Sequence, residues 1–417
     1  MEGLLLLIAG VTFGFALVSN RFEKSLITPP MVFSGIGVLV ALFLPEMLSK
    51  FDGRAVLEIV AELTLVVVLF TDASRIRLRL LFRQYRLPLR LLGVGLPLTV
   101  LLGALAAKII VPDFSIWEAA LLGAILAPTD AALGQAVVSS KKIPERIRQS
   151  LNVESGLNDG IVLPLVMLFA VLSSVNAESE QNWLVYWTLQ VTLGPLVGIA
   201  VGLVGGYLLK TSRNAGWLNE DFQRLSGIAL ALLAWAGALH VGGNGFIAAF
   251  VAGMCISIYS DSIGQSMRDF GEAEGQLLSL ATFLLFGAVL IVPAFKAITV
   301  GCLIYALLSL TVVRMLPVML ALRGLNIKKP TFWFLGWFGP RGLASLLFAL
   351  LVVSEFEMPH GEVILNFAVA TVLLSMTAHG LSAIPGAELY SRQLKSSEDS
   401  FEHEPCEHHR DKFSAKS

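Results

Sequence analysis

Long apolar runs recur along almost the whole chain, and they limit what the chain can fold into. Each run has about 17–25 residues, the length that crosses a hydrocarbon core about 30 Å thick at a rise of about 1.5 Å per residue. Only 15% of the residues are charged and 55% are hydrophobic, whereas a soluble domain carries about 25% charged residues. The sequence therefore predicts an all-α polytopic membrane protein.

We expect about thirteen membrane-spanning helices. The first run opens on Met1-Glu2 without a basic segment, so we interpret it as a span rather than a signal peptide. The weakest division lies at the Gly-Gly-Asn-Gly stretch 242–245, which fits either a tight hairpin or one broken helix. The expected spans are 3–19, 28–45, 55–73, 88–108, 115–137, 149–174, 183–210, 224–241, 243–260, 273–292, 296–322, 331–353 and 361–386.

The basic residues are concentrated in every second connecting loop. The clearest examples are the loops at 74–87 and 138–148. Lys and Arg in short loops favour the cytoplasmic side of the membrane. The bias predicts an inner-membrane protein with its N-terminus outside and its C-terminus in the cytoplasm, which requires an odd number of spans.

A polar segment follows the last span. Residues 390–417 are mostly charged or small and cannot bury enough apolar surface to become ordered, so we expect a short disordered cytoplasmic tail. Metal binding by its His-rich stretch stays an open alternative. The three cysteines, Cys255, Cys302 and Cys406, show no disulfide or metal-ligand spacing. We expect no cofactor and no nucleic-acid partner.

Six of the charged residues inside the expected spans are candidates for a functional site. Each charge near the bilayer centre costs about 2.5–3.5 kcal/mol on insertion scales, so these side chains must face the bundle interior or water and pair with one another. Asp130 and Asp159 lie deep in their runs, whereas Asp72 lies at a span end and also fits a headgroup position. The six are Asp72, Asp130, Glu154, Asp159, Arg314 and Arg341.

The sixth expected span carries an oxygen-rich face. Ser155 and Asp159 are four residues apart and share one side of a helix, while Glu154 and Asn158 share another side. Hydroxyl and carboxylate oxygens are hard ligands that suit a small hard cation. We pair Glu154 with Arg341 as a hypothesis, because a guanidinium group cannot be deprotonated and needs a carboxylate. This leaves Asp130 and Asp159 to the cation.

Two expected spans are interrupted close to these charges. Pro128 precedes Asp130 in the fifth span, and Gly339-Pro340 precedes Arg341 in the twelfth. Proline frees backbone carbonyls, and irregular backbone at membrane depth is tolerated where it lines a cavity. Interrupted spans in the two halves of a chain indicate the binding site of a secondary transporter.

Four motifs together resemble the NhaP branch of the sodium/proton exchanger family. They are APTD at 127–130, ESGLNDG at 154–160, GFIAAFVAG at 245–253 and GWFGPRG at 336–342. The resemblance implies two inverted repeats, two crossed unwound helices and a homodimer. It also implies interface helices in 1–87 and 216–295, core helices in 88–174 and 296–389, and a linking helix in 175–215, before the tail at 390–417.

The resemblance also implies roles for individual residues. Asp159 and Asp130 would be the ion and proton carboxylates, Thr129 and Ser155 oxygen ligands of Na+, and Asn158 the group that orients the site. Glu154 and Arg341 would be a structural ion pair. In addition, Asp72 matches an acidic position near the site loosely, and Arg314 is a candidate charge partner. An asparagine before the key aspartate implies electroneutral exchange of one proton per cation.

The expected function is therefore exchange of Na+ or Li+ for H+ by alternating access, and the protein is not expected to be an enzyme. Two carboxylates in a partly desolvated site disfavour joint ionisation, so protons and the cation compete for the same oxygens. K+/H+ exchange is the alternative, because the oxygen ligands alone do not fix the cation. An intramembrane aspartyl protease fits less well, since the aspartates lack the Tyr-Asp and Gly-x-Gly-Asp contexts of such proteases. A cation channel also fits less well, because channels typically build rings from identical subunits, whereas two interrupted helices suggest alternating access.

Overall fold

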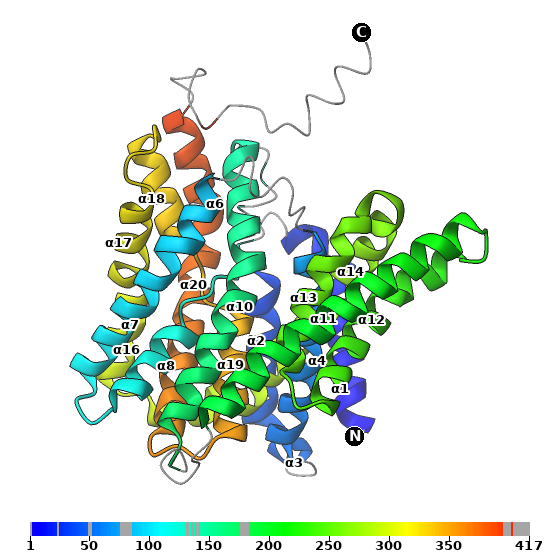
Figure 1. The fold of residues 1–417 in the computed structure, drawn as a ribbon. Coiled ribbons are helices and arrows are strands. Elements are labelled where there is room, and N and C mark those ends of the chain that lie inside the picture. The colour runs from blue at the N-terminus through cyan, green and yellow to red at the C-terminus, as the bar shows by residue number, and fades with distance from the viewer. Residues whose placement is uncertain are drawn as a thin grey trace.

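The computed structural model shows a helical bundle without strands among the residues that it describes (Figure 1). It describes residues 2–22, 25–48, 52–75, 86–130, 133, 134, 137, 140, 142–175, 183–394 and 402. Within them, eight helices are long and apolar enough to cross a membrane, and several shorter apolar helices accompany them. The prediction of an all-α polytopic membrane protein is confirmed, while the number of thirteen spans stays a prediction.

The helices overlap the expected spans, but residues 261–272, which were expected to form a loop, are part of a helix, and part of the expected span 115–137 lies outside the described residues. The first part of the chain forms α1 (Glu2–Phe22), α2 (Pro29–Phe43), α3 (Pro45–Leu48), α4 (Gly53–Ser74), α6 (Arg86–Arg90), the π-helix η1 (Leu91–Gly95), α7 (Leu96–Ile110), α8 (Ile116–Ile125) and α10 (Glu145–Ser173). The middle part forms α11 (Trp183–Asn214), α12 (Glu220–His240), α13 (Gly245–Ile256), the 3-10 helix η3 (Ser257–Tyr259), α14 (Ser260–Phe286), the π-helix η4 (Gly287–Ile291) and α15 (Val292–Ala297). The last part forms α16 (Val300–Leu310), α17 (Val312–Ala321), α18 (Lys329–Trp337), α19 (Leu343–Glu355) and α20 (Gly361–Leu394).

Two groups of helices pack side by side in the bundle. Helices α7, α8, α10 and α16 to α20 pack on one another in the left part of Figure 1. Helices α4, α11, α12, α13 and α14 pack on one another in the right part. Contacts of α4 with α10 and with α19 join the two groups. The predicted division of the chain into core, linking and interface segments remains a prediction.

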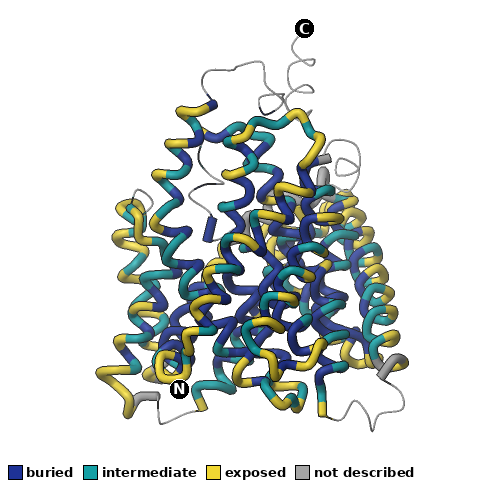
Figure 2. Tube along the Cα trace, turned by 90° about the vertical axis from the view of Figure 1, so that its left-hand side faces the viewer, coloured by how far each residue is buried: buried dark blue, intermediate teal, exposed yellow. Residues whose placement is uncertain are grey.

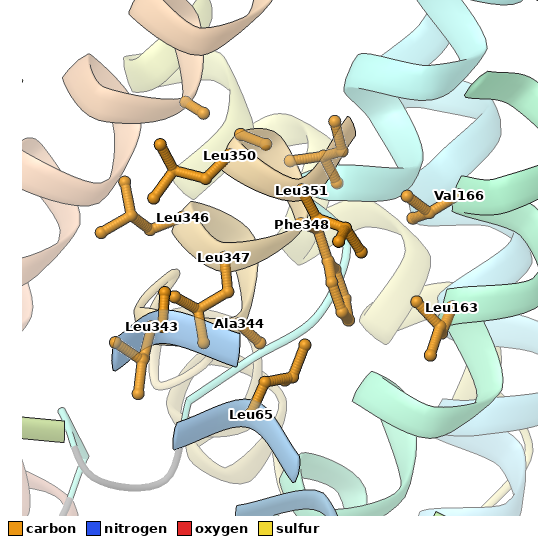
Figure 3. Close-up of a cluster of buried hydrophobic side chains, with 14 of the residues drawn as sticks. Leu65, Leu163, Val166, Leu343, Ala344, Leu346, Leu347, Phe348, Leu350 and Leu351 are labelled. Carbon is orange, nitrogen blue, oxygen red and sulfur yellow. The ribbon is translucent and has the colours of Figure 1, made fainter. Parts of the chain in front are cut away.

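Helix α19 lies at the centre of the apolar interior. Every residue from Leu343 to Val352 is buried, because the helix is apolar on all sides and is surrounded by other helices. Figure 3 shows that Leu65 of α4 and Leu163 of α10 lie close to its side chains. Exposed residues gather on the outside of the bundle (Figure 2), and apolar ones such as Phe13 form a surface suited to lipid.

A tight turn separates α12 from α13. Gly242 has a φ of +81°, a backbone conformation that favours glycine because it has no Cβ. Asn244 then caps α13, accepting a hydrogen bond from the backbone N–H of Ile247 over 3.0 Å. Of the two interpretations of this stretch, the hairpin is therefore the one that the structure shows.

The C-terminal end of the described chain is more ordered than predicted. Helix α20 continues to Leu394, beyond the predicted start of the tail at Tyr390. Glu402 is buried, and its carboxylate accepts hydrogen bonds from the backbone N–H of Lys328 and the hydroxyl of Thr331. A disordered tail is therefore wrong for these residues, because the start of α18 offers donors to the carboxylate. Residues 395–401 and 403–417, which include the His-rich stretch, lie outside the described residues.

Candidate functional site

Two unwound segments meet in the middle of the bundle. Residues 127–130 follow α8 without regular secondary structure, and residues 338–342 separate α18 from α19. The backbone N–H of Asp130 donates to the carbonyl of Pro340 over 2.8 Å. The N–H of Leu343, at the start of α19, donates to Oδ2 of Asp130, also over 2.8 Å. The predicted interruptions at Pro128 and Pro340 are thus where two broken helices contact each other.

The close contact between the segments depends on Gly342. A Cβ atom built at Gly342 would lie 2.6 Å from the Cβ and 2.7 Å from the Cγ of Asp130. Real Cβ atoms do not approach other atoms so closely, so a larger residue would push the two segments apart. The glycine in the GPRG sequence therefore has a steric explanation at the crossing.

We expect Gly342→Ala to impair transport because the added methyl group displaces the Asp130 carboxylate. The matched control is Gly35→Ala in α2, where an added Cβ meets no atom within 4 Å. Cation-driven proton flux in proteoliposomes is the measurement, with the amount of folded protein determined for each variant. Equal flux in G342A and G35A would contradict the steric explanation.

Helix α10 brings its polar residues to the first unwound segment. The Thr129 and Ser155 hydroxyls lie 3.1 Å apart, and Nδ2 of Asn158 donates to Oγ1 of Thr129 over 2.8 Å. Oδ1 of Asp159 is buried and has no hydrogen-bond partner among the described residues. A buried carboxylate oxygen without a partner is costly unless an ion, a proton or water satisfies it. The predicted oxygen-rich face of this helix therefore points to a place where a cation would be stabilised.

A cavity of about 370 Å³ connects these groups. Asp72 of α4 contributes to the same wall, which favours its interpretation as a site residue over that of a headgroup residue. Asn158 is 1% exposed and does not line the cavity, but its side chain donates a hydrogen bond to the Thr129 hydroxyl. The cavity is lined, among others, by Asp72, Thr129, Asp130, Ser155 and Asp159. Five of the six residues predicted to bind the ion thus face one space.

The cavity lining includes exposed residues at the end of the bundle where α4 ends and α10 begins. It reaches Arg75 and Asn152, which lie near the basic loops at 74–87 and 138–148. In the other direction, Leu65 and Leu347 separate it from a cavity of about 10 Å³, which is about the size of one water molecule. The site is therefore accessible from the end with the basic loops and closed by apolar side chains toward the other end.

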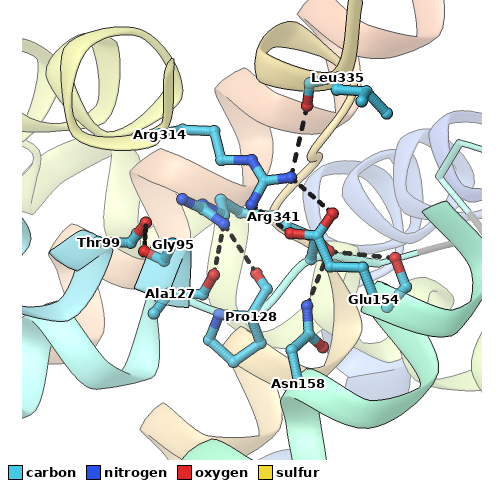
Figure 4. A network of polar contacts seen from close by, with 11 residues as sticks. Gly95, Thr99, Ala127, Pro128, Glu154, Asn158, Arg314, Leu335 and Arg341 are labelled. Atoms are coloured by element: carbon cyan, nitrogen blue, oxygen red, sulfur yellow. Dashed lines mark hydrogen bonds and ion pairs between the residues drawn. The ribbon is translucent and has the colours of Figure 1, made fainter. Parts of the chain in front are cut away.

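Glu154 forms its ion pair with Arg314, not with Arg341 as predicted. Its two carboxylate oxygens accept from Nη1 and Nη2 of Arg314 over 2.5 and 2.9 Å, and both side chains are buried (Figure 4). Arg314 lies on α17, which faces α10 across the unwound segment. The bidentate geometry fixes both partners. The predicted charge partner Arg314 is therefore the structural partner of Glu154.

Arg341 instead binds the first unwound segment. Its Nη1 donates to the carbonyls of Ala127 and Pro128 over 2.6 and 3.1 Å (Figure 4). These carbonyls are free because the helix ends before them and Pro128 cannot continue it. Arg341 itself is fully buried. Its side chain thus holds the two unwound segments together, a role that the sequence pattern did not indicate.

The sequence analysis also missed two residues of α20 that contact the second unwound segment. Ser375 and His379 are buried and bind the backbone of Arg341 and Trp337, respectively. Neither residue is charged in its ordinary form, and neither belongs to one of the four motifs. The only signal is their spacing of four residues within an apolar span, which places both on one side of a helix.

Comparison with protein families decides what kind of protein has this site. A family model described as "Sodium/hydrogen exchanger, transmembrane" matches residues 4–388. The chain belongs to this family. The resemblance stated from the four motifs is thereby confirmed, and this sodium/hydrogen exchanger family is one of membrane transporters and not of enzymes.

Several known proteins are similar to this member of the exchanger family over most of its length. The K(+)/H(+) antiporter NhaP2 of Shewanella sp. (strain ANA-3) is 26% identical over 393 residues, which cover 93% of this chain and 66% of the relative. The probable Na(+)/H(+) antiporter C3A11.09 of Schizosaccharomyces pombe is 24% identical over 342 residues, which cover 76% and 44% of the two chains. The chain thus spans about two thirds of the length of the bacterial relative and less than half of the length of the yeast protein.

A solved structure supports the exchanger fold. The sodium proton antiporter MjNhaP1 from Methanocaldococcus jannaschii superposes with a TM-score of 0.77, covering 94% of this chain and 98% of that protein. The two sequences are 19% identical. The likeness shows that the exchanger chain has the NhaP fold, as the motifs predict.

Proposed function

We propose that the protein is a secondary antiporter that exchanges Na+ or Li+ for H+. The observation that carries the proposal is the cavity in which the Asp130 and Asp159 carboxylates meet the Thr129 and Ser155 hydroxyls. Carboxylate and hydroxyl oxygens bind small hard cations well and also accept protons. One set of oxygens therefore serves both transported ions.

The charges at the crossing support exchange of one proton per cation. The crossing contains three carboxylates (Asp130, Glu154 and Asp159) and two guanidinium groups (Arg314 and Arg341), a net charge of −1 when all are ionised. Asp72 and Arg75 also line the cavity and carry opposite charges, so counting both leaves this net charge unchanged. One monovalent cation or one proton neutralises this charge, and a buried net charge is costly. The site is thus expected to change sides only when one of the two occupies it.

The one-sided cavity supports alternating access. The site is accessible from the end with the basic loops, which we place in the cytoplasm, and Leu65 and Leu347 close it toward the other end. Because these residues come from α4 and α19, movement of the α19 group past the α4 group would open the closed side and close the open one. A channel would instead need both ends open at once.

Potassium is the second candidate cation. The Shewanella relative bears the name of a K(+)/H(+) antiporter, whereas the structurally similar MjNhaP1 is named a sodium proton antiporter. The oxygen ligands at the site suit either ion, and the cavity is large enough for both. We place sodium first because a compact set of two carboxylates and two hydroxyls favours the smaller ion.

The experiment that tests the function uses purified protein in proteoliposomes with an imposed pH gradient. Na+, Li+ or K+ is added in turn, with and without a potassium–valinomycin voltage clamp. We expect Na+ and Li+ to dissipate the pH gradient at a rate that the clamp does not change. Dissipation by K+ alone would show that K+ and not Na+ is the transported cation. Cation flux without proton flux would identify a channel.

We expect the exchange rate to fall when both sides of the membrane are acidified together. Protonated carboxylates no longer attract the cation, so protons compete with it more strongly at lower pH. The measurement is the initial rate of Na+ uptake at equal pH on both sides across a pH series, at low and at saturating Na+. Higher Na+ should shift the fall in rate to lower pH, and a rate that rises on acidification would contradict the competition.

We also propose that the protein is a homodimer in the inner membrane. The family resemblance supports the dimer, and the basic loops support a cytoplasmic C-terminus. In Figure 1, α1 begins at one end of the bundle and α20 ends at the opposite end, as an odd number of spans requires. Mass measurement of the protein in nanodiscs tests the dimer, and a mass of one chain per disc at all concentrations would contradict it.

A further inference from the structure

Helix α20 contacts the second unwound segment at Arg341 and the last residue before this segment, Trp337 of α18. The backbone N–H of Arg341 donates to Oγ of Ser375 over 2.7 Å. At the other end, Nε2 of His379 lies 2.8 Å from the carbonyl oxygen of Trp337, and the two rings lie 4.9 Å apart. Ser375 and His379 are one helical turn apart, so one side of α20 holds the whole segment.

Both ring nitrogens of His379 lie within hydrogen-bond distance of backbone carbonyl oxygens. The Trp337 carbonyl can only accept, so Nε2 of His379 must carry the proton. Nδ1 lies 2.9 Å from the carbonyl oxygen of Ser375 and 3.2 Å from its hydroxyl oxygen, and that hydroxyl accepts from the backbone N–H of Arg341. A protonated imidazole would add a positive charge beside the buried Arg341 and Arg314, which is unfavourable without a counter-charge. His379 thus bonds to the backbone of Trp337 through Nε2 and to Ser375 through Nδ1.

The same segment positions a carboxylate of the cation site. Between its two anchored ends, the carbonyl of Pro340 accepts from the N–H of Asp130. Immediately after it, the N–H of Leu343 donates to the Asp130 carboxylate. A shift of the segment relative to α20 would therefore move both hydrogen bonds that orient Asp130.

We infer that Ser375 and His379 are positioning residues of the cation site, which act through the unwound segment 338–342 on Asp130. This inference rests on the proposed function. The two residues are 0% and 1% exposed, and the residues that line the cavity do not include them, so they act without touching the cation.

Helix α20 is suited to this role because it is long and continuous. It has 34 residues, whereas α18 and α19 have 9 and 13 and are joined only by the unwound segment. Unwound backbone has no helical hydrogen bonds of its own, so its conformation depends on outside partners. With Arg341 bound to Ala127 and Pro128 as well, the two unwound segments and α20 form one connected unit.

The test compares Ser375→Ala and His379→Leu with variants that keep the hydrogen bonds. We expect S375A and H379L each to raise the half-saturating Na+ concentration for exchange by about tenfold, which is the effect of losing one buried hydrogen bond. The maximal rate should change less. Ser375→Thr keeps the hydroxyl and His379→Gln keeps a donor, so both should restore the value at least partly. The matched control is Thr377→Ala, because the Thr377 hydroxyl bonds only to carbonyls of α20 itself.

The possible outcomes distinguish a failure of this inference from a failure of the proposed function. Variants that lose folded protein or maximal rate but keep the wild-type half-saturating concentration would show a purely structural role and overturn the inference alone. The same holds if S375T and H379Q behave like S375A and H379L. Absence of exchange with Na+, Li+ and K+ in the wild type would overturn the proposed function, and the inference with it.

Discussion

We expect cation-driven proton flux to fall to background when Asp159 is replaced with Asn. The amide has nearly the same shape as the carboxylate but carries no charge and no exchangeable acid proton. The site then lacks the net negative charge that a cation or proton neutralises, and Oδ1 of residue 159, which faces no partner in the described structure, loses its affinity for cations. The flux is measured in proteoliposomes with an imposed pH gradient.

Asp113→Asn is the matched control for this variant. Asp113 is exposed in the turn between α7 and α8 and does not line the cavity. Removing its charge should leave the flux unchanged, while both proteins reconstitute to the same level. Wild-type flux in D159N, or loss of flux in D113N, would show that the exchanged ions bind elsewhere.

We expect replacement of Glu154 with Gln to lower the stability of the fold more than it lowers the affinity for the cation. The substitution leaves the Arg314 guanidinium buried without its counter-charge, and breaking a buried ion pair in this way costs about 3–5 kcal/mol. The pair lies at the crossing but not in the cavity wall, since Glu154 and Arg314 are absent from the cavity lining. The measurements are the apparent melting temperature in detergent and Na+ binding by the folded fraction.

Double variants test which arginine is the partner of Glu154. Replacing a buried ion pair with apolar residues of similar volume is often neutral or stabilising. Glu154→Leu combined with Arg314→Met should therefore regain most of the melting temperature lost in E154Q. Glu154→Leu combined with Arg341→Met should not regain it, because it still leaves Arg314 unpaired. If only the double variant with Arg341→Met regained the melting temperature, Arg341 would be the partner of Glu154, as first expected from the sequence.

The spans and both interruptions follow from the sequence because their causes are local. Apolar length sets the helices, and Pro128 and the Gly339-Pro340 pair end helices wherever they occur. The face of α10 with Ser155 and Asp159 follows equally from helical periodicity. Thr129 then joins that face in the structure through its contacts with Ser155 and Asn158. Local rules were sufficient to place these parts of the site.

The partner of Glu154 could not be predicted because it depends on contacts distant in sequence. Arg314 and Arg341 both lie in spans near the crossing, and no spacing rule distinguishes them. Arg341 lies in the unwound segment, where helical periodicity does not apply and free carbonyls compete for its guanidinium group. Arg314 lies on a regular helix that faces α10. The choice is therefore a property of the assembled bundle.

The contacts of α20 and of Glu402 were missed for a related reason. Ser375 and His379 look like ordinary polar residues in an apolar span, and only the fold brings the backbone of Arg341 and Trp337 to them. Composition classified Glu402 as a tail residue, although its carboxylate accepts hydrogen bonds at the start of α18. Composition describes the average of a segment and does not identify a single residue that finds donors.

Proton release on cation binding is the most direct test of the central claim that one set of carboxylates serves both ions. Purified protein in weak buffer with a pH indicator is mixed with saturating Na+ across a range of starting pH. The account predicts release of about one proton per chain where the site is protonated at the start, and none from D159N. Binding of Na+ without proton release at any pH would show that the ions do not compete, and would contradict the account.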